Sequence, residues 1–430
     1  MPPKIERNGN KAKITIEVDL SGSMMDMENK IQDALNVAGA TLTKEALERF
    51  DTHGQPLKFG DVKFTVQQKA VKDYETPYGC ISVARHVYQT SKGGRTYCPM
   101  DADARIVKSS TPRFAQIVSS KYVNLGSAGV QTDLEISNGR KVSRCYIQCL
   151  AETVGTYAQA VEESMDYKIP DQKEKVVTIG MSLDGTCMYM KDEGWREAMT
   201  GTLSLYNAAG DRLHTIYLGA APEYGKESFL KKFEQEVIKI KKKFPDAACV
   251  GIADGAQCNW KFLEQHTTIR ILDFYHATQY LAGAAQAFGS GQGEHKVWLD
   301  KACHILKHEE KGARTLLEEM EKKRKVMDFH ARSTRIISEG LDKAITYFTN
   351  QLDRMNYKKW QEEYLPIGSG VTEAACKTLI KQRLCNSGMK WKNTGAQVVI
   401  SLRAMARTDG RWAQFWDRLN TQGLTGVLLA

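Results

Sequence analysis

Two aspartates and one glutamate stand where a folded chain commonly places catalytic groups. Asp184 and Asp254 each follow a run of apolar residues typical of a β-strand, and glycine follows each of them. Catalytic groups gather at strand ends in α/β sheets, and a glycine there lets the backbone turn and leaves room for a ligand. Glu373 follows a Gly-Ser-Gly sequence and opens a predicted helix. These carboxylates are remote along the chain, so only the fold can bring them together.

Carboxylates that converge repel one another and raise one another's pKa. A divalent cation relieves this repulsion, and Mg²⁺ or Mn²⁺ prefers carboxylate oxygens. Two such ions about 4 Å apart can activate a water or a 3′-hydroxyl and stabilise the leaving oxygen of an in-line displacement at phosphorus. The pattern therefore predicts a two-metal site in which Asp184, Asp254 and Glu373 are both the catalytic residues and the metal ligands.

Each of these residues also has a structural interpretation, which the pattern alone leaves open. An Asp-Gly sequence after a strand is commonly a plain turn. Glu373 and Lys377 are four residues apart, and such pairs are common on the surface of helices.

A basic stretch follows Glu373 and contains one tryptophan. Its members are Lys377, Lys381, Arg383, Lys390, Trp391 and Lys392. Near an active site it can hold DNA phosphates, and Trp391 can stack on an unpaired base. The alternative is a solvated helix with a core tryptophan. Trp195, Trp260 and Trp298 are expected in the core rather than as base-stacking platforms.

A second basic group opens a predicted helix that begins near residue 143. Arg140, Lys141 and Arg144 lie there, after helical segments joined by glycine-containing turns. This arrangement fits a helix-turn-helix DNA reader. A small helical bundle with a solvated basic end is the alternative.

Hydrophobic periodicity predicts the elements that must position these residues. In the second half of the chain, strands are expected at 176–183, 199–206 and 213–218, then a helix, then strands at 248–253 and 269–272. That order, with three antiparallel strands followed by parallel additions, is ribonuclease H-like. Residues 293–364 are helical in pattern and are expected to form an all-α insertion. The expected class is α/β.

The first 170 residues predict a different mixture. A helical region at 22–52 precedes a β-hairpin that turns at residues 76–79, and helices follow from residue 111. The expected parts of the chain are a helical region at 1–58, a β-hairpin region at 59–110, a helix-turn-helix-like DNA-binding region at 111–170, the first part of the ribonuclease H-like core at 171–292, the all-α insertion at 293–364, and the rest of the core, with Glu373, at 365–430.

Composition limits the kind of partner and the compartment. The 60 Lys and Arg residues exceed the 51 Asp and Glu residues, and the net charge of +9 suits a polyanionic partner without requiring one. The chain has no stretch of about 20 apolar residues. Its first ten residues lack the apolar segment of a signal peptide. We therefore expect a cytoplasmic protein with no membrane segment.

Four motifs resemble those of ISKra-type transposases, a bacterial insertion-sequence family of the DDE superfamily. In chain order they are VTIGMSLDGT at 177–186, IADGAQCNW at 252–260, ILDFYHATQYL at 271–281 and LPIGSGVTEAACKTLIKQRLCNSGMKWKNTGAQVVISLR at 365–403. The third is similar to the D-x-x-H element shared with Mutator-like transposases. The resemblance implies that Asp184, Asp254 and Glu373 are the metal ligands. It also assigns Asp273 and His276 to the D-x-x-H element, for which we expect a supporting role; a buried histidine paired with a local carboxylate is the alternative.

The activity that this resemblance implies is cleavage of insertion-sequence ends and strand transfer into target DNA, with two Mg²⁺ (or Mn²⁺) ions per site. Its partner would be double-stranded DNA, and pairing two element ends implies a homodimer or a higher oligomer. Two other functions fit the same residues. A metal-dependent nuclease or junction resolvase would cleave without joining strands, and a domesticated DNA-binding descendant would do neither.

Overall fold

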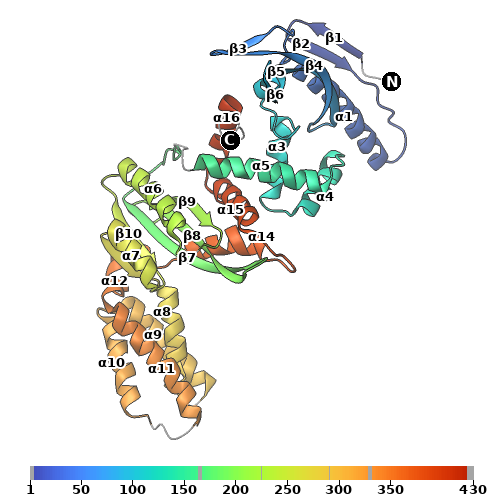
Figure 1. Cartoon of the computed structure of the whole chain (residues 1–430). Coiled ribbons are helices and arrows are strands. Elements are labelled where there is room, and N and C mark those ends of the chain that lie inside the picture. Colours follow the sequence, from blue (N-terminus) through green and yellow to red (C-terminus); the bar gives the residue numbers. More distant parts are fainter. Residues whose placement is uncertain (1–3, 163–166, 224, 290, 328–331, 424–430) are drawn as a thin grey trace. The chain divides into compact units, whose positions relative to one another are not determined.

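The chain is a mixed α/β protein that divides into two compact units. A computed structural model describes residues 4–162, 167–223, 225–289, 291–327 and 332–423 (Figure 1). Unit 1 comprises residues 1–168, 401–406 and 410–430, and unit 2 comprises residues 169–400 and 407–409. Within the described ranges, no helix has both the length and the apolar character that crossing a bilayer requires.

Unit 1 contains two antiparallel sheets and a group of helices. Its elements are β1 (Lys4–Asn8), β2 (Lys11–Thr15), α1 (Met24–Glu48), β3 (Leu57–Phe59), β4 (Val62–Glu75), β5 (Cys80–Thr90), β6 (Gly93–Tyr97), α2 (Pro99–Asp103), α3 (Pro112–Tyr122), α4 (Ser127–Asn138), α5 (Arg144–Glu162) and α16 (Arg411–Gln422). β1 pairs with β2 alone, and the larger sheet has the order β3-β4-β5-β6. Leu47 of α1 packs on this sheet and forms a buried cluster with its residues Tyr74, Ile81 and Val83.

The sequence predicted part of this unit correctly. α1 lies within the helical region expected at 22–52, and the predicted hairpin turn is confirmed by the hydrogen bond from the Thr76 N–H to the Gly79 carbonyl, 3.0 Å. The prediction that residues 1–58 are helical is wrong for the β1–β2 hairpin. Every residue of β1 and β2 is exposed or half-buried, so neither strand has the buried apolar face from which a strand is recognised.

Unit 2 is built on one five-stranded sheet. Its elements are β7 (Thr178–Met190), β8 (Gly194–Tyr206), β9 (Arg212–Ala220), α6 (Glu227–Lys243), β10 (Ala248–Ala253), α7 (Gln257–His266), β11 (Ile269–Leu272), α8 (Phe274–Ala285), α9 (Gln292–His308), α10 (Gly312–Lys325), α11 (Arg332–Gln351), the 3₁₀ helix η1 (Leu352–Arg354), α12 (Tyr357–Glu362), α13 (Gly370–Ala375), the π-helix η2 (Cys376–Lys381) and α14 (Gln382–Leu384); α15 (Asn393–Arg407) begins in this unit. The strand order is β11-β10-β7-β8-β9. β7, β8 and β9 are antiparallel, whereas β10 is parallel to both β7 and β11.

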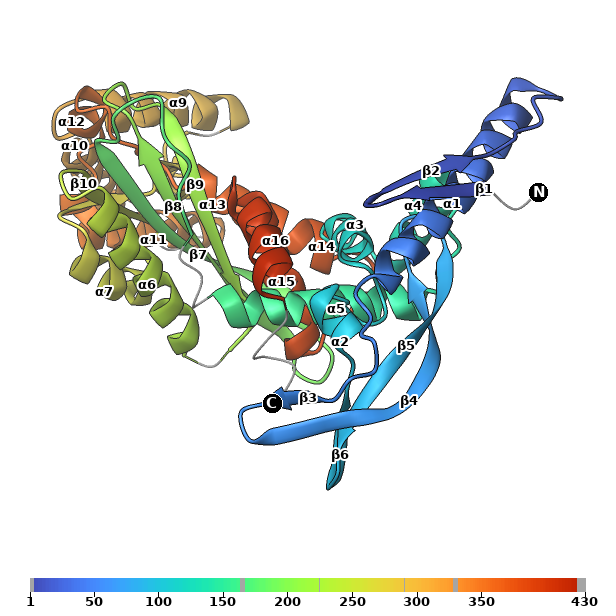
Figure 2. The same ribbon diagram turned by 90° about the horizontal axis from the view of Figure 1, so that it is seen from above.

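Helices cover both faces of this sheet (Figure 2). On one face a Cβ added at Gly201 would meet the ring of Phe233 of α6 at 2.6 Å, so that helix lies directly on the backbone of β8. On the other face a Cβ added at Gly219 would meet Ile400 of α15 at 2.5 Å. Asp184 pairs with Thr200, and Thr200 pairs with Gly219. Asp184 therefore points to the face that η2 and α15 cover, since paired residues share a face.

β7 does not end where the sequence predicted. The strand was expected to stop at Asp184, but it continues to Met190 because β8 pairs with it along its whole length. Asp184-Gly185 is therefore not a turn. Gly185 lies beside Glu197, and a Cβ there would meet the Glu197 carboxylate at 2.2 Å, so a larger residue would displace that exposed side chain. The parallel pairing with β10 ends at Ser182, so Asp184 still lies where two strands separate.

The described residues between β11 and α13 are helical and contain no strand. Helices α8 to α11 pack side by side (Figure 1). Phe288 stacks on Trp298 at a ring distance of 4.0 Å. The core prediction is confirmed for Trp260, which is 4% exposed, and wrong for Trp195, which is 67% exposed at the end of the β7–β8 hairpin.

Candidate active site

Three aspartates lie next to one another at one end of the sheet of unit 2. When the parallel registers of β10 are continued past their last paired residues, Asp254 falls beside Asp184 on one side and beside Asp273 on the other. The Asp273 N–H donates to the carbonyl of Ala253 at 2.8 Å, which fixes the second of these pairs. Neighbouring strands are about 4.8 Å apart, so the three side chains start close together.

Asp184 is held by its neighbours on two elements. Its Oδ1 atom accepts a hydrogen bond from the Gly185 N–H at 2.7 Å, and its Oδ2 atom accepts one from the Cys376 thiol at 3.4 Å. Burial raises the pKa of Asp184 above its ordinary value, and the nearby charge of Asp254 raises it further. Burial, together with Asp184, raises the pKa of Cys376 to about 12. Cys376 is therefore a neutral hydrogen-bond donor.

Asp254 follows β10 and is positioned by the turn that it begins. Its Oδ1 atom accepts a hydrogen bond from the Ala256 N–H at 3.0 Å. Its backbone carbonyl accepts a hydrogen bond from the Tyr347 hydroxyl of α11 at 2.6 Å. Gly255 has a φ of +106°, a conformation that side-chain-bearing residues rarely adopt, so glycine is required in this turn.

Glu373 reaches the same end of the sheet from α13. The hydroxyls of Thr372 and Thr202 are hydrogen-bonded at 2.6 Å, which attaches α13 to β8. Burial raises the pKa of Glu373, and the charge of Asp273 raises it further. The Oε1 atom of Glu373 is buried and accepts no hydrogen bond. A buried carboxylate oxygen without a donor is costly unless a cation faces it.

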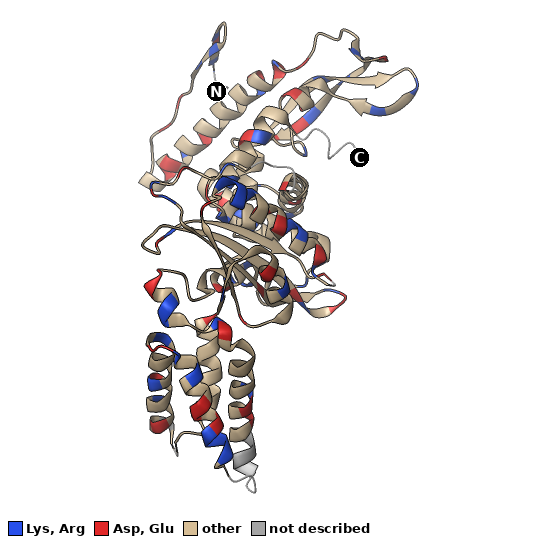
Figure 3. Cartoon of the chain, turned by 90° about the vertical axis from the view of Figure 1, so that its left-hand side faces the viewer, with Lys and Arg blue, Asp and Glu red and all other residues tan. Residues whose placement is uncertain are grey.

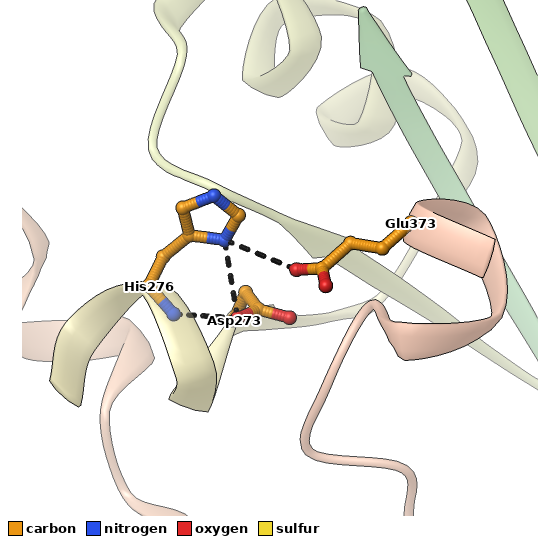
Figure 4. A group of neighbouring side chains, drawn as sticks. All are labelled: Asp273, His276 and Glu373. Atoms are coloured by element: carbon orange, nitrogen blue, oxygen red, sulfur yellow. Dashed lines mark hydrogen bonds and ion pairs between the residues drawn. The ribbon is translucent and has the colours of Figure 1, made fainter. Parts of the chain in front are cut away.

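Asp273, His276 and Glu373 form the tightest group of possible ligands among the described residues (Figure 4). His276 Nδ1 lies 3.2 Å from Asp273 Oδ1 and 3.6 Å from Glu373 Oε1. The hydrogen bond with Asp273 raises the pKa of His276, and the charges of Asp254 and Glu373 add to the effect. Burial alone would raise the pKa of Asp273, but hydrogen bonds from His276 and Ser369 lower it below its usual value.

Asp273 is engaged by the protein, unlike Glu373. It is fully buried, and its Oδ1 atom accepts from the His276 N–H at 2.7 Å while its Oδ2 atom accepts from the Ser369 N–H. Both oxygens therefore hold backbone in place. This favours the supporting role expected for Asp273 over a role as a principal ligand.

A cavity of about 680 Å³ opens beside these groups. Its lining residues are Asp184, Gly185, Thr186, Tyr275, His276, Gln279, Glu373, Cys376, Lys377, Lys381 and Gln382. The acids Asp184 and Glu373 thus share one cavity, whereas Asp254 does not line it. Asp254 nevertheless acts on the site, because its charge raises the pKa of both Asp184 and His276.

The predicted DNA-binding residues after Glu373 separate into two groups. Lys377 and Lys381 are exposed on η2 and line the cavity. π-Helical turns are rare and frequently occur at functional sites. Lys390 and Lys392 are also exposed, but they follow α14 and do not line the cavity.

Arg383 and Trp391 make contacts within the protein. Arg383 is 3% exposed and lies over the Trp391 ring at 5.6 Å. The Trp391 Nε1–H donates to the carbonyl of Leu384 at 2.8 Å. Both side chains therefore hold the segment that follows η2 in place. For Trp391 this is the structural role, the alternative to stacking on an unpaired base.

In unit 1 the three predicted DNA-binding cations differ in exposure. Arg140 is 7% exposed, forms an ion pair with Glu75 and donates to the carbonyl of Thr76 at 3.2 Å. Lys141 is exposed and lies 3.8 Å from Glu135, and Arg144 is exposed at the first residue of α5. Arg140 is thus committed to the packing of unit 1, while the other two face solvent.

Several residues near the acids were not predicted from the sequence. Tyr275, 58% exposed, and Gln279 line the cavity from successive turns of α8. Cys376 donates a hydrogen bond to the Asp184 carboxylate, and Tyr347 donates one to the backbone carbonyl of Asp254. A helical repeat would have put Tyr275 and Gln279 beside His276, but nothing in the sequence pairs Tyr347 with Asp254.

Comparison with known proteins adds no family assignment. No protein-family model matches the chain, and no curated protein matches it significantly. The geometry of unit 2 and the motifs of the sequence are therefore the basis for a functional proposal.

Proposed function

We propose that this chain is a DNA transposase of the DDE type, with a ribonuclease H-like core in unit 2. The strand order β11-β10-β7-β8-β9, with three antiparallel strands and two parallel additions, supports this fold. The helices α9 to α12, which precede Glu373, are compatible with an all-α insertion. The observation that carries the proposal is that Asp184 and Glu373, remote in sequence, line one cavity at the sheet end where Asp254 also lies.

The donor set fits divalent cations. Four carboxylates, those of Asp184, Asp254, Asp273 and Glu373, meet there with one histidine, and burial raises the pKa of Asp184 and of Glu373 although the charge of His276 opposes the shift. The buried Oε1 atom of Glu373 accepts no hydrogen bond and lies 3.6 Å from His276 Nδ1, so a cation would face this oxygen in place of the ring. Asp184, Asp254 and Glu373 would hold two Mg²⁺ or Mn²⁺ ions, hard cations that prefer such oxygens. When bound, the ions supply activation of a water or 3′-hydroxyl and stabilisation of the leaving oxygen.

The remaining residues of the cavity have separate tasks in this proposal. Lys377 and Lys381 bind the phosphates on either side of the scissile bond, since ammonium groups are point-charge phosphate ligands. Cys376 keeps the Asp184 carboxylate oriented through its thiol hydrogen bond. Asp273 orients His276 and holds the start of α13, so it acts as a positioning residue.

The direct test is metal-dependent cleavage and joining of DNA. Wild-type protein would be incubated with Mg²⁺ or Mn²⁺ and the DNA that flanks its coding sequence, and then with a pre-cut 3′-hydroxyl donor end and a plasmid target. We expect strand cleavage and strand transfer. Cleavage without transfer would favour the nuclease alternative, and binding without cleavage would favour the DNA-binding descendant.

Three variants identify the site: Asp184→Asn, Asp254→Asn and Glu373→Gln. Each should reduce cleavage by about 100- to 1,000-fold, because removing one electrostatic stabiliser of a transition state costs on that order. Each should retain DNA binding. Glu362→Gln, on the exposed side of α12, is the matched control and should cleave normally. Full activity in any of the three site variants would refute the assignment.

A further inference from the structure

The four-stranded sheet of unit 1 ends in two adjacent hairpin turns. One turn joins β3 to β4, and the other joins β5 to β6. Because Phe64 at the start of β4 lies opposite Thr90 at the end of β5, both turns lie at the same end of the sheet. We refer to residues 57–64 and 89–97 as the double-turn end.

The exposed charges of the double-turn end are nearly all positive (Figure 3). Lys58, Lys63, Lys92 and Arg95 are exposed, and Asp61 is the one acid in these two segments. Within the described part of the chain, none of the four cations has an ion-pair partner.

Some cations elsewhere in unit 1 form ion pairs. Lys72 pairs with Asp101 at 3.0 Å, and Lys30 pairs with Asp19 at 2.7 Å. Arg140 pairs with Glu75, as described above. The double-turn end thus gathers four unpaired positive charges on two adjacent turns.

Two of these cations are placed against each other. Lys58 of β3 lies directly opposite Lys63 of β4 in the antiparallel register. Like charges in that position destabilise a sheet by up to about 1 kcal/mol. Protection of an exposed edge by lysine would explain Lys58, which is on the edge strand. It does not require a second lysine directly opposite the first, and Lys63 is paired with β3 alone, because the pairing of β4 with β5 begins at Phe64.

Aromatic residues support the other face of the same segment. The ring of Phe59 lies edge-on against those of Phe64 and Tyr97, at 5.8 and 5.5 Å. Since side chains alternate along a strand, Phe59 and Lys58 point to opposite faces. The aromatic cluster therefore stiffens a ribbon whose reverse face carries the facing lysines.

We propose that the double-turn end binds the phosphates of duplex DNA, with a hairpin seated in a groove. A two-stranded ribbon fits the major groove, which is about 12 Å wide. Lys58 and Lys63 would contact the backbone of one strand, with Lys92 and Arg95 extending the contact from the neighbouring turn. The choice of DNA as the polyanion rests on the proposed function. The observation that this surface carries unpaired positive charge is independent of that function.

The test is the salt dependence of duplex binding by the full chain. Binding of a fluorescein-labelled 30-base-pair duplex would be measured between 50 and 300 mM NaCl for wild type and for the double variant Lys58→Gln, Lys63→Gln. Each lost phosphate contact lowers the slope of log K against log salt by about 0.9, so a slope smaller by about 1.8 is expected. At 0.1 M salt this corresponds to a loss of affinity of roughly 60-fold.

Two further variants make the result specific. Lys58→Arg with Lys63→Arg keeps both charges and should keep the wild-type slope. Lys4→Gln with Lys44→Gln removes two exposed lysines of β1 and α1 and should also leave it unchanged. Circular dichroism melting of each variant verifies folding.

An unchanged slope in the folded Gln double variant would overturn the proposal, as would loss of single-stranded but not duplex DNA binding. Metal-dependent cleavage by wild type is measured in the same preparations. Its absence would contradict the proposed transposase while the slope still reported on the double-turn end, so the two failures are distinguishable.

Discussion

The carboxylate of Asp273 accepts a hydrogen bond from the backbone N–H of Ser369, and this bond joins the end of β11 to the start of α13. The carbonyl of Ser369 in turn accepts from the Glu373 N–H at 3.0 Å. Glu373 is therefore positioned by a chain of two hydrogen bonds that begins on the sheet. Asp273, which the sequence assigned to a supporting element, therefore links the sheet to Glu373.

Replacing Asp273 by Asn should loosen this link. The variant keeps one acceptor oxygen but loses the second, so a buried N–H is left without its partner, at a cost of about 1–3 kcal/mol. We expect a lower melting temperature and weaker Mn²⁺ binding, measured by scanning fluorimetry and isothermal titration calorimetry. Asp246→Asn, on an exposed loop, is the control. Unchanged stability and Mn²⁺ affinity in Asp273→Asn would contradict the positioning role.

Divalent cations should stabilise unit 2. A ligand present at 100 times its Kd stabilises the folded state by about 2.7 kcal/mol. We expect Mn²⁺ to raise the melting temperature of wild type, but not of Asp184→Asn or Glu373→Gln. In EDTA both variants should melt above wild type, because removing a buried charge relieves desolvation and repulsion. An equal Mn²⁺ response in all three proteins would exclude these acids as ligands.

The contact between α11 and the Asp254 turn should affect activity more than stability. Tyr347→Phe removes the hydroxyl that donates to the Asp254 carbonyl, at a cost of about 1 kcal/mol. Single-turnover cleavage should fall more than this loss predicts, since Asp254 moves with its backbone. Tyr364→Phe, on an exposed ring, is the control. Gly255→Ala should be more damaging, because its φ is +106° and a Cβ would lie 3.0 Å from the Tyr347 ring.

Arg140 and Arg144 should separate packing from DNA binding. Arg140→Gln breaks a largely buried ion pair with Glu75 and the contact of the guanidinium with the Phe114 ring, 5.5 Å away. A loss of about 2–3 kcal/mol of stability is expected. Arg144→Gln, at an exposed site, should leave the melting temperature unchanged and weaken duplex binding if α5 reads DNA. The reverse result, binding lost without destabilisation in Arg140→Gln, would restore Arg140 as a DNA contact.

Acid should destabilise unit 2 through His214. Burial lowers the pKa of His214 below its ordinary value, so below about pH 6.5 the unfolded chain binds more protons than the folded chain. This contribution to stability is present above pH 6.5 and is lost as the pH falls. The raised pKa values of Asp184 and Glu373 act in the opposite direction. The measurement therefore compares His214→Gln with wild type in EDTA. Between pH 7 and pH 5 the melting temperature of the variant should fall less than that of wild type.

The sequence predicted elements with strong apolar contrast and missed those without it. The buried strands β7, β8 and β10 have runs of apolar residues and were found, but only β10 had the predicted bounds, because β7 and β8 both extend further into the hairpin that joins them. The β1–β2 hairpin was missed although Asn8-Gly9 is a strong turn signal, because its strands bury nothing. β3 and β6 were missed because they are short and bury no residue, whereas the equally short β11 has an apolar, partly buried run.

The candidate site was predictable as a set of residue types but not as a geometry. An Asp-Gly pattern locates Asp184 and Asp254, yet it does not reveal that β7 continues past Asp184. Nor can a pattern reveal that Asp273 and His276 form one close group with Glu373. Their expected supporting role did not require this closeness. Such contacts depend on the tertiary packing of α8 and α13, which local periodicity does not encode.

Helices α13 and η2 reach the sheet of unit 2 late during synthesis on the ribosome. These helices, with the start of α15, cover one face of β7, β8 and β9, but they are synthesised after the whole α8–α12 region. Until then the face of the sheet that carries Thr200, Thr202 and Ser204 stays uncovered, and the Thr202 hydroxyl lacks its partner on Thr372. A product terminated before residue 370 would carry Asp184 and Asp254 but not Glu373, and one face of its sheet would lack its helices, so it would have neither a complete fold nor, under the proposed function, a complete metal site.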